Sequence, residues 1–239
     1  IAVADMYLSG IIAKNLKVKH FIAQFMFNTP PSISLEMDLA KMLAKNELLN
    51  SLADENFKII KQTRAGLASF PLDLDQAKGQ LALSSLIQLA LKPDIIHVVS
   101  YSEADHAASP KDVIESCKIV HQVINKSYAS NLSFLDQKVL DRKDELIKQA
   151  KWIIDQIPKL AVSQAEKKNP WINSNVLNRI VKYGIFDAPH LKNNDFAKGE
   201  IKTDIVNGAC DSLDSVNGMP INEIERITTI INNNSELYS

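Results

Sequence analysis

The sequence has few cysteines, almost no net charge and no long apolar run. Its 2 cysteines, Cys117 and Cys210, stand far apart and form neither a CxxC pair nor the Cys/His spacing of a metal site. We therefore expect no metal centre and a cytoplasmic protein, with one disulfide as the less favoured alternative. No apolar stretch approaches the roughly 18 residues of a membrane span. The net charge of −1 gives no reason to expect binding to nucleic acid or to an anionic membrane.

Several catalytic motifs are also missing. The chain contains no glycine-rich phosphate loop, no GxSxG nucleophile elbow and no HExxH motif. These absences argue against P-loop NTPases, α/β-hydrolases of the GxSxG type and HExxH metalloproteases. The sequence has no internal repeat and no low-complexity tract either. Its first residues lack an initiator Met and a signal-peptide pattern, so we expect a piece of a longer protein.

Helix-type and strand-type segments alternate through the first 130 residues. The apolar spacing predicts helices at 2–16, 34–52, 74–91 and 111–126, and strands at 18–27, 57–63 and 94–101. The hydroxyl of Ser34 is expected to cap the second of these helices. Because crossovers of helical length join successive strands, these strands should be parallel. Three strands cannot close a barrel, so we predict an α/β fold that is the C-terminal part of a (β/α)8 TIM-type barrel. A flavodoxin-like open sheet is the alternative.

The pattern changes after residue 130. A long charged helix is expected at 133–165, where Pro158 should kink or end it. A short helix follows at 171–183. The tail at 184–239 shows little periodicity, and we expect it to be irregular apart from a helix near 221–231. The predicted domains are therefore 1–130, with the barrel strands and helices, and 131–239, a helical and irregular extension.

Ionisable residues follow two of the predicted strands. Arg64 comes just past the second strand beside small residues, and its guanidinium is able to hold a carboxylate or phosphate. Glu103, Asp105 and His106 follow the third strand, where a histidine beside carboxylates suits proton transfer. The competing interpretations are an ordinary surface arginine and a capped turn leading into the next helix, with Ser109 and Pro110 as helix-start residues.

A second acid–histidine pair, Asp187 and His190, lies in the tail within GIFDAPHL. We expect it to be a structural loop that packs Phe186 rather than a catalytic pair. Cys117 falls within an amphipathic segment and is expected to be a small core residue.

Several segments, taken in order, resemble a known family. They are the VK strand at Val18, the SFP motif at 69–71, the strand, loop and helix at 96–113, and GIFDAP with the following AKGE. In this order they are similar to the C-terminal half of the large (epsilon) subunit of glutamate mutase, or methylaspartate mutase. The likeness covers most of the chain and is weakest at 131–165. It implies a (β/α)8 barrel that acts with a small cobalamin-binding subunit and isomerises a small carboxylate by a radical route.

The resemblance also assigns residues to the adenosylcobalamin cofactor. Phe70 matches a phenylalanine that contacts the cofactor. Ser100 and Ala104 stand where the family has a lysine and a glutamate that contact the adenosyl part. Ala108 aligns with a further apolar contact. Glu103 lies one residue from the glutamate position and is a candidate to replace it.

Together these observations predict a mutase-like subunit whose substrate need not be glutamate. Arg64, Glu103 and His106 are the candidate catalytic residues, and Arg64 falls where the family has a histidine at a strand end. The DxHxxG motif that supplies a lower cobalamin ligand is absent, so a partner subunit or another domain would hold the corrinoid, and an oligomer is expected. One alternative is a barrel protein that has lost the corrinoid and uses the Glu/Asp/His cluster for acid–base or metal-assisted chemistry. Another is a non-catalytic interaction subunit that pairs through exposed strand edges.

Overall fold

The computed structural model describes residues 1–127, 134–234 and 237, and the chain falls into two compact units. The first unit comprises Ile1–Phe21, Glu47–Lys58 and Asp144–Ser239, and the second comprises Ile22–Asn46 and Ile59–Lys143. The domain boundary expected between residues 130 and 131 lies outside the described residues, so that division stays a prediction.

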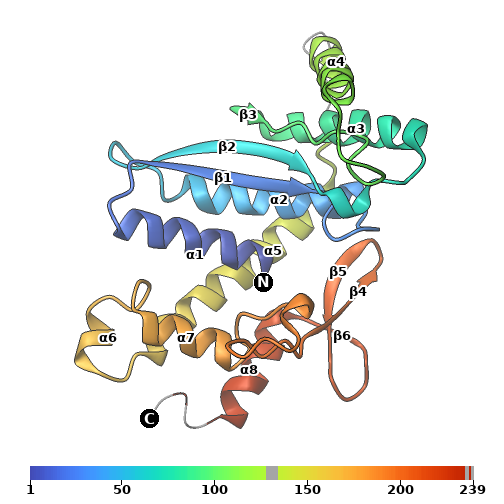
Figure 1. Cartoon of the computed structure of the whole chain (residues 1–239). Helices are drawn as coiled ribbons and strands as arrows, with labels where there is room; N and C mark the ends of the chain where they lie inside the picture. The colour runs from blue at the N-terminus through green and yellow to red at the C-terminus, as the bar shows by residue number, and fades with distance from the viewer. Residues whose placement is uncertain (128–133, 235–236, 238–239) are drawn as a thin grey trace. The chain divides into compact units, whose positions relative to one another are not determined.

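The strands β1 (His20–Phe27), β2 (Lys58–Ala65) and β3 (Ile95–Ile96) form one three-stranded sheet in that order (Figure 1). The Lys58 N–H donates to the Lys19 carbonyl and the Gly66 N–H to the Phe27 carbonyl, so β1 and β2 run in the same direction. The pairing of β2 with β3 is also parallel. The predicted parallel α/β arrangement is confirmed to this extent.

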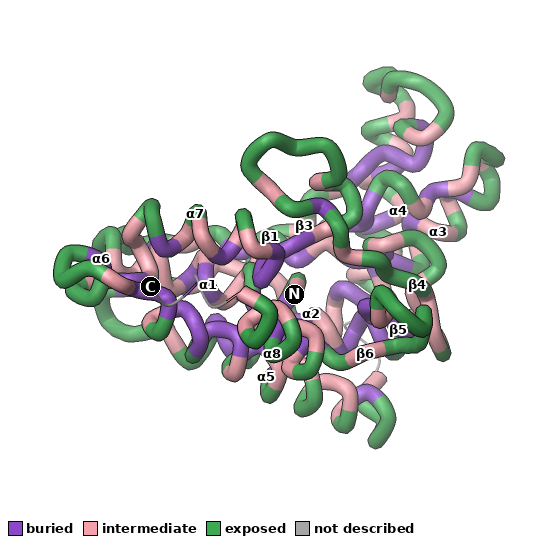
Figure 2. Tube along the Cα trace, turned by 90° about the horizontal axis from the view of Figure 1, so that it is seen from below, coloured by how far each residue is buried: buried purple, intermediate pink, exposed green. Residues whose placement is uncertain are grey.

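The helices that follow the three strands have the expected order. They are α2 (Leu35–Asn50), α3 (Leu74–Gln88) with the 3-10 turn η2 (Leu89–Leu91), and α4 (Pro110–Ser127). Ser34 caps α2 as predicted, since its hydroxyl accepts a hydrogen bond from the Met37 N–H at 3.3 Å. Asp73 caps α3 in the same way through the Gln76 N–H. Buried and exposed residues alternate along α3 and α4, as expected for helices that pack with one side (Figure 2).

The third strand is much shorter than the predicted segment 94–101. The Thr63 carbonyl accepts a hydrogen bond from the His97 N–H at 2.8 Å, but the strand itself ends at Ile96. Beyond this point the chain carries Val99 and Tyr101 into an apolar cluster with α3 and α4, and Ser100 between them is also buried. Burial of three successive side chains is incompatible with the edge of a half-exposed sheet, so the chain leaves the ladder.

The predicted charged helix at 133–165 is divided into shorter pieces. Helix α5 (Gln137–Gln156) passes into a 3-10 turn, η3 (Ile157–Leu160), which contains Pro158, so the expected break is confirmed. A separate short helix, α6 (Gln164–Lys168), then begins with a capping box of Ser163 and Glu166. The predicted start at residue 133 lies outside the described residues.

The remaining elements of the first unit include a sheet that the sequence analysis missed. They are α1 (Ala2–Asn15), α7 (Ser174–Lys182), η4 (Pro189–Leu191), β4 (Lys202–Val206), β5 (Ala209–Leu213), β6 (Pro220–Ile221) and α8 (Glu223–Asn233). The prediction of an irregular tail is therefore wrong for the segment that forms the antiparallel sheet β4–β5–β6. Asn207 and Gly208 connect β4 to β5 with φ of 50° and 81°. Two successive positive φ values suit the tight turn of a hairpin, which explains the Asn-Gly pair.

No helix within residues 1–127 and 134–234 combines the length and the apolar character needed to cross a bilayer. Both cysteines are free.

Candidate functional site

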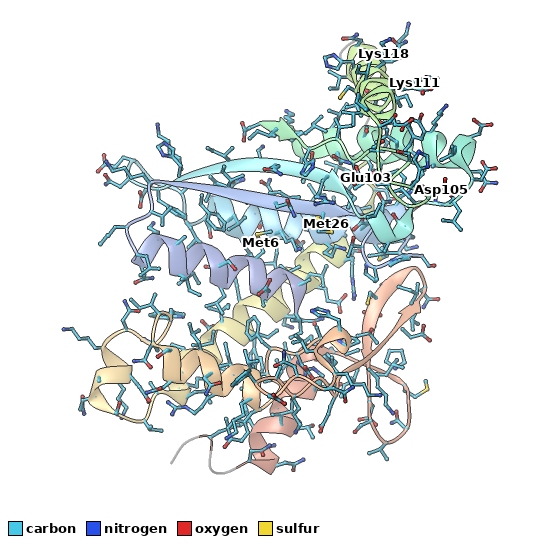
Figure 3. The ribbon with its side chains drawn as sticks, viewed as in Figure 1. Met6, Met26, Glu103, Asp105, Lys111 and Lys118 are labelled. Carbon is cyan, nitrogen blue, oxygen red and sulfur yellow. The ribbon has the colours of Figure 1, made fainter. Side chains whose placement is uncertain are left out.

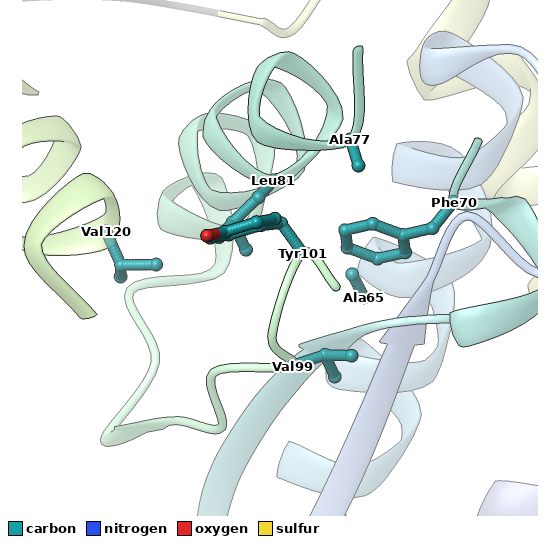
Figure 4. Close-up of a cluster of buried hydrophobic side chains, with 7 residues drawn as sticks. All are labelled: Ala65, Phe70, Ala77, Leu81, Val99, Tyr101 and Val120. Atoms are coloured by element: carbon teal, nitrogen blue, oxygen red, sulfur yellow. The ribbon is translucent and has the colours of Figure 1, made fainter. Parts of the chain in front are cut away.

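The loops after β2 and β3 meet over one apolar cluster in the second unit. Because the strands are parallel, both loops leave the same edge of the sheet. The buried side chains beneath them are those of Ala65, Phe70, Ala77, Leu81, Val99, Tyr101 and Val120 (Figure 4). Strand ends, both loops, α3 and α4 all contribute to this cluster, which fixes the positions of the polar residues around it.

Phe70 is a core residue of this cluster. The 3-10 turn η1 (Leu67–Ser69) delivers its ring, which is only 7% exposed, to the neighbourhood of Ala65 and Ala77 (Figure 4). Ala104 packs partly against the same cluster, whereas Ala108 lies outside it and is half-buried. The structure thus gives Phe70 a packing role, and its contact with a cofactor stays a prediction.

Three buried serines form a hydrogen-bonded group next to the cluster. The Ser100 Oγ lies 3.0 Å from the Ser102 Oγ and 3.3 Å from the Ser116 Oγ. The Ser116 hydroxyl also accepts from the Tyr101 N–H at 3.2 Å and donates to the Asp112 carbonyl at 2.7 Å. These bonds tie the loop after β3 to α4. Ser100 is only 2% exposed, and its hydroxyl is hydrogen-bonded to the other two serines.

Tyr101 joins the loop to two carboxylates of α4. Its hydroxyl donates to Glu115 Oε2 at 2.8 Å and to Asp112 Oδ1 at 3.1 Å. These two bonds and partial burial raise the pKa of the Tyr101 phenol, with the bond to Glu115 as the largest cause. Lys78 of α3 pairs with Glu115 at 2.8 Å and lies 4.8 Å from the centre of the Tyr101 ring. The hydrogen bond between them lowers the pKa of Glu115 and raises that of Lys78.

The structure brings Asp105 and His106 together as predicted. Asp105 Oδ2 lies 2.8 Å from His106 Nδ1, and Asp112 Oδ2 lies 3.5 Å from His106 Nε2. The bond to Asp105, supported by Asp112, raises the pKa of the imidazole. Its side chain is 45% exposed, so the ring remains open to solvent. A histidine held in this way keeps its proton to a higher pH than a free one and is able to deliver it to a bound molecule.

The same loop is also a helix start, as the competing interpretation proposed. The Ser109 hydroxyl and N–H donate to Asp112 Oδ2 at 2.6 and 2.9 Å. These bonds, first that of the Ser109 side chain, hold the pKa of Asp112 at about 2. The carboxylate of Asp112 therefore bonds to the helix-start residue Ser109 and also lies beside His106. A helix start and an ionisable cluster are compatible interpretations of this loop.

Glu103 and Arg64 do not bond to the histidine. Glu103 points its carboxylate back to the Ser100 N–H at 2.7 Å, and Figure 3 labels it on the same loop as Asp105. Arg64 is half-buried on β2, where its Nε donates to the Ala65 carbonyl at 3.3 Å. Among the described residues no hydrogen bond or ion pair joins Arg64, Glu103 and His106. The three predicted catalytic residues thus share a sheet edge without forming one bonded group.

Asp187 has a structural role in the first unit. Its buried carboxylate accepts hydrogen bonds from four backbone N–H groups, those of Ala188, Gly199, Glu200 and Ile201, at 2.7 to 3.0 Å. His190 is exposed, and within the described part of the chain no bond links it to Asp187. This geometry supports the structural interpretation of the GIFDAPHL segment.

Sequence reasoning missed Tyr101, Asp112, Glu115 and Ser116 as members of the site. Asp112, Glu115 and Ser116 are spaced three and four residues apart, so they lie on one side of a helix that follows the Tyr101 loop. That spacing was the signal available in the sequence. No group of three or more His, Cys, Asp or Glu side chains within the described residues is arranged to hold a metal ion.

No protein-family model matches this sequence, and no curated protein matches it significantly.

Proposed function

We propose that this chain forms part of the barrel of a carbon-skeleton mutase-like enzyme whose corrinoid is held by a separate subunit or domain. The main observation in support of this proposal is that the loops after β2 and β3 leave the same edge of a parallel sheet and cover one apolar cluster. Active sites of parallel α/β barrels lie at this edge of the sheet. The substrate is a small carboxylate, which need not be glutamate.

The two faces of the sheet support a barrel sector. Ala23, Phe25 and Phe27 of β1 are fully buried, whereas Ile22 on the opposite face is 54% exposed and Gln24 is exposed. Parallel sheets are normally covered on both faces, by helices or, in a barrel, by helices outside and the other strands inside. A sector of such a barrel has this asymmetry, and further β/α units would cover the exposed face.

The residues present fit a corrinoid only in part. Ala104 and Ala108 are half-buried and offer apolar contact at the mouth. Phe70 and Ser100 are buried, and the Ser100 hydroxyl is bonded to other serines, so neither side chain offers a free polar group. The charged contacts that the family makes at positions 100 and 104 are not reproduced.

The role of this chain's residues is to shape the mouth and to hold protons. A bound corrinoid would supply the radical chemistry. Tyr101 and Phe70 close the floor beneath the loops with apolar surface, which excludes water there. His106 holds a proton at Nδ1 or Nε2 between Asp105 and Asp112, at the rim of the same edge.

Retention of corrinoid tests this proposal. The intact protein, a small cobalamin-binding protein and adenosylcobalamin would be mixed with candidate carboxylates, and the visible absorbance of the protein peak measured after gel filtration. We expect co-elution in the parent, loss in Ala108→Arg, and no loss in Ala53→Arg, which puts the same side chain at an exposed site before β2. Equal retention by both variants would place the cofactor elsewhere.

A second candidate function is acid–base catalysis without a corrinoid. The exposed His106 with its raised pKa between two carboxylates favours it. Under this alternative the parent protein converts its substrate without retaining corrinoid, and the His106→Ala variant has no activity. Corrinoid retention by the parent would eliminate it.

A further inference from the structure

The exposed face of the sheet carries a connected row of polar side chains. Gln62 Nε2 lies 3.4 Å from Gln24 Oε1 and 3.4 Å from His97 Nδ1. Alternate residues of a strand share a face, so Arg64 lies on the same face as Gln62. The parallel register pairs Gln62 with Ile95, and His97, two residues beyond Ile95, therefore lies on the same face.

The carboxyl ends of the strands bring a cation and an imidazole onto this face. Ile22 and Ile60 precede the two glutamines on β1 and β2, whereas Arg64, His97 and Met26, which Figure 3 labels, lie at the carboxyl ends. Within the second unit the set on this face is Ile22, Gln24, Met26, Ile60, Gln62, Arg64, Ile95 and His97, and His20 and Lys58 precede it at the amino ends of β1 and β2. This set contains no aspartate or glutamate, so the polar end of the face has donors and a cation without a carboxylate.

Arg64 differs from the other arginines whose contacts the structure defines. Arg179 pairs with Glu166 at 2.5 Å and Arg226 pairs with Glu223 at 2.8 Å. Within the described residues Arg64 has no carboxylate partner, and the only hydrogen bond of its side chain there is from Nε to the adjacent Ala65 carbonyl. A half-buried guanidinium with both terminal nitrogens unused is suited to a carboxylate that arrives from outside the chain.

We propose that Arg64, Gln62 and His97 form a binding site for a small organic carboxylate on this face of the sheet. The inference rests on the proposed function, because the face becomes a chamber when further β/α units cover it, and it assigns the substrate's carboxylate to named residues. Arg64 grips the carboxylate with two N–H groups, and the Gln62 amide and the His97 ring bond to the remaining polar atoms of the ligand. The apolar side chains of Ile22 and Ile60 bound the site on the side toward the amino ends of the strands.

Calorimetric titration of the intact protein with succinate tests the site, with succinamide as the uncharged analogue. Arg64→Gln is expected to weaken succinate binding about ten-fold or more, since charge-assisted bonds to a carboxylate are lost. Gln62→Leu and His97→Phe are expected to weaken it less. Lys118→Gln removes an exposed cation of α4, labelled in Figure 3, and should leave the affinity unchanged. Succinamide should bind far more weakly than succinate to the parent protein.

Two further comparisons keep the result decisive. Arg64→Lys retains the charge but not the planar fork, so it should also weaken binding, and thermal unfolding of each variant shows that it is folded. Equal affinity in the parent and Arg64→Gln overturns the inference, as does an equal loss in Lys118→Gln. Corrinoid retention is measured separately. If the protein retains corrinoid but binds succinate equally well without Arg64, the carboxylate site is wrong and the proposed function stands. If succinate binding depends on Arg64 but no corrinoid is retained, the corrinoid function is wrong and the carboxylate site stands.

Discussion

Asp105 Oδ2 lies 2.8 Å from His106 Nδ1, on an exposed loop that leads from β3 into α4. The carboxylate stabilises the protonated ring, and Asp112 supports it from the Nε2 side. The loop thereby favours the protonated form of the histidine at the sheet edge where the site is proposed.

Replacing Asp105 with Asn should lower the pKa of His106 toward its ordinary value of 6.5. The reason is that the amide removes the negative charge at Nδ1, which is the largest cause of the shift. Titration of the ring protons by NMR measures the effect. Glu103→Gln is the matched control, because Glu103 bonds to the Ser100 N–H and not to the ring. If both variants leave the His106 pKa at its parent value, the pairing is absent in solution.

The His106 pair should also stabilise the fold in a defined pH range. Because the folded-state pKa is raised, the stabilisation is fully present below the unfolded value of 6.5 and is lost as the pH rises through the folded value. Urea unfolding at several pH values should therefore show the stability difference between the parent and Asp105→Asn shrinking above that range. A difference independent of pH would contradict the linkage.

Asp112 should contribute to stability in the opposite direction. Its folded pKa of about 2 lies below the ordinary value of 3.8, so its contribution is present above 3.8 and is lost as the pH falls through about 2. As the pH falls from 3.8 to about 2, the Asp112→Asn variant should therefore lose less stability than the parent protein. Thermal unfolding at several pH values in this range measures the difference. Identical acid profiles would show that Ser109 and Tyr101 do not hold this carboxylate.

Phe70→Ala should destabilise the fold by about 3 to 5 kcal/mol, because removing a buried aromatic ring leaves a cavity. Chemical unfolding in urea measures the change. Phe70→Leu fills part of the space and should cost less. A change within about 0.5 kcal/mol, as found for exposed positions, would show that the ring is not part of the core.

Asp187→Ala should destabilise the protein by about 2 to 4 kcal/mol, since it leaves several backbone N–H groups without an acceptor. His190→Ala removes an exposed side chain and should change stability by less than about 0.5 kcal/mol. Unfolding curves of the two variants give the comparison. Similar effects from both would indicate that the two residues act as a pair, contrary to the observed geometry.

The sequence predicted the elements whose patterns are local. The Ser34 cap of α2, the start of α4 at Pro110 and the break around Pro158 all follow from the chemistry of neighbouring residues. The proximity of Asp105 and His106 was predictable for the same reason. The Asn207–Gly208 pair is an equally local signal, since two successive positive φ values suit a hairpin turn, although the segment around it was predicted to be irregular.

Long-range packing accounts for the rest. The segment 94–101 is rich in β-branched residues like a strand, but Val99 and Tyr101 pack into the apolar cluster and the chain leaves β2. The contact of Tyr101 with Glu115 depends on how α4 returns over the loop, which no short pattern encodes. The row from Gln24 through Gln62 to His97 likewise requires the strand order and register.

The central claim is most directly tested by sedimentation velocity observed at the visible absorption of a corrinoid. The intact protein would be mixed with a small cobalamin-binding protein, adenosylcobalamin and a panel of small carboxylates. The account predicts that the absorbing boundary sediments with a complex larger than the cobalamin-binding protein alone. A corrinoid boundary that never moves with this protein, whichever carboxylate is present, would contradict it.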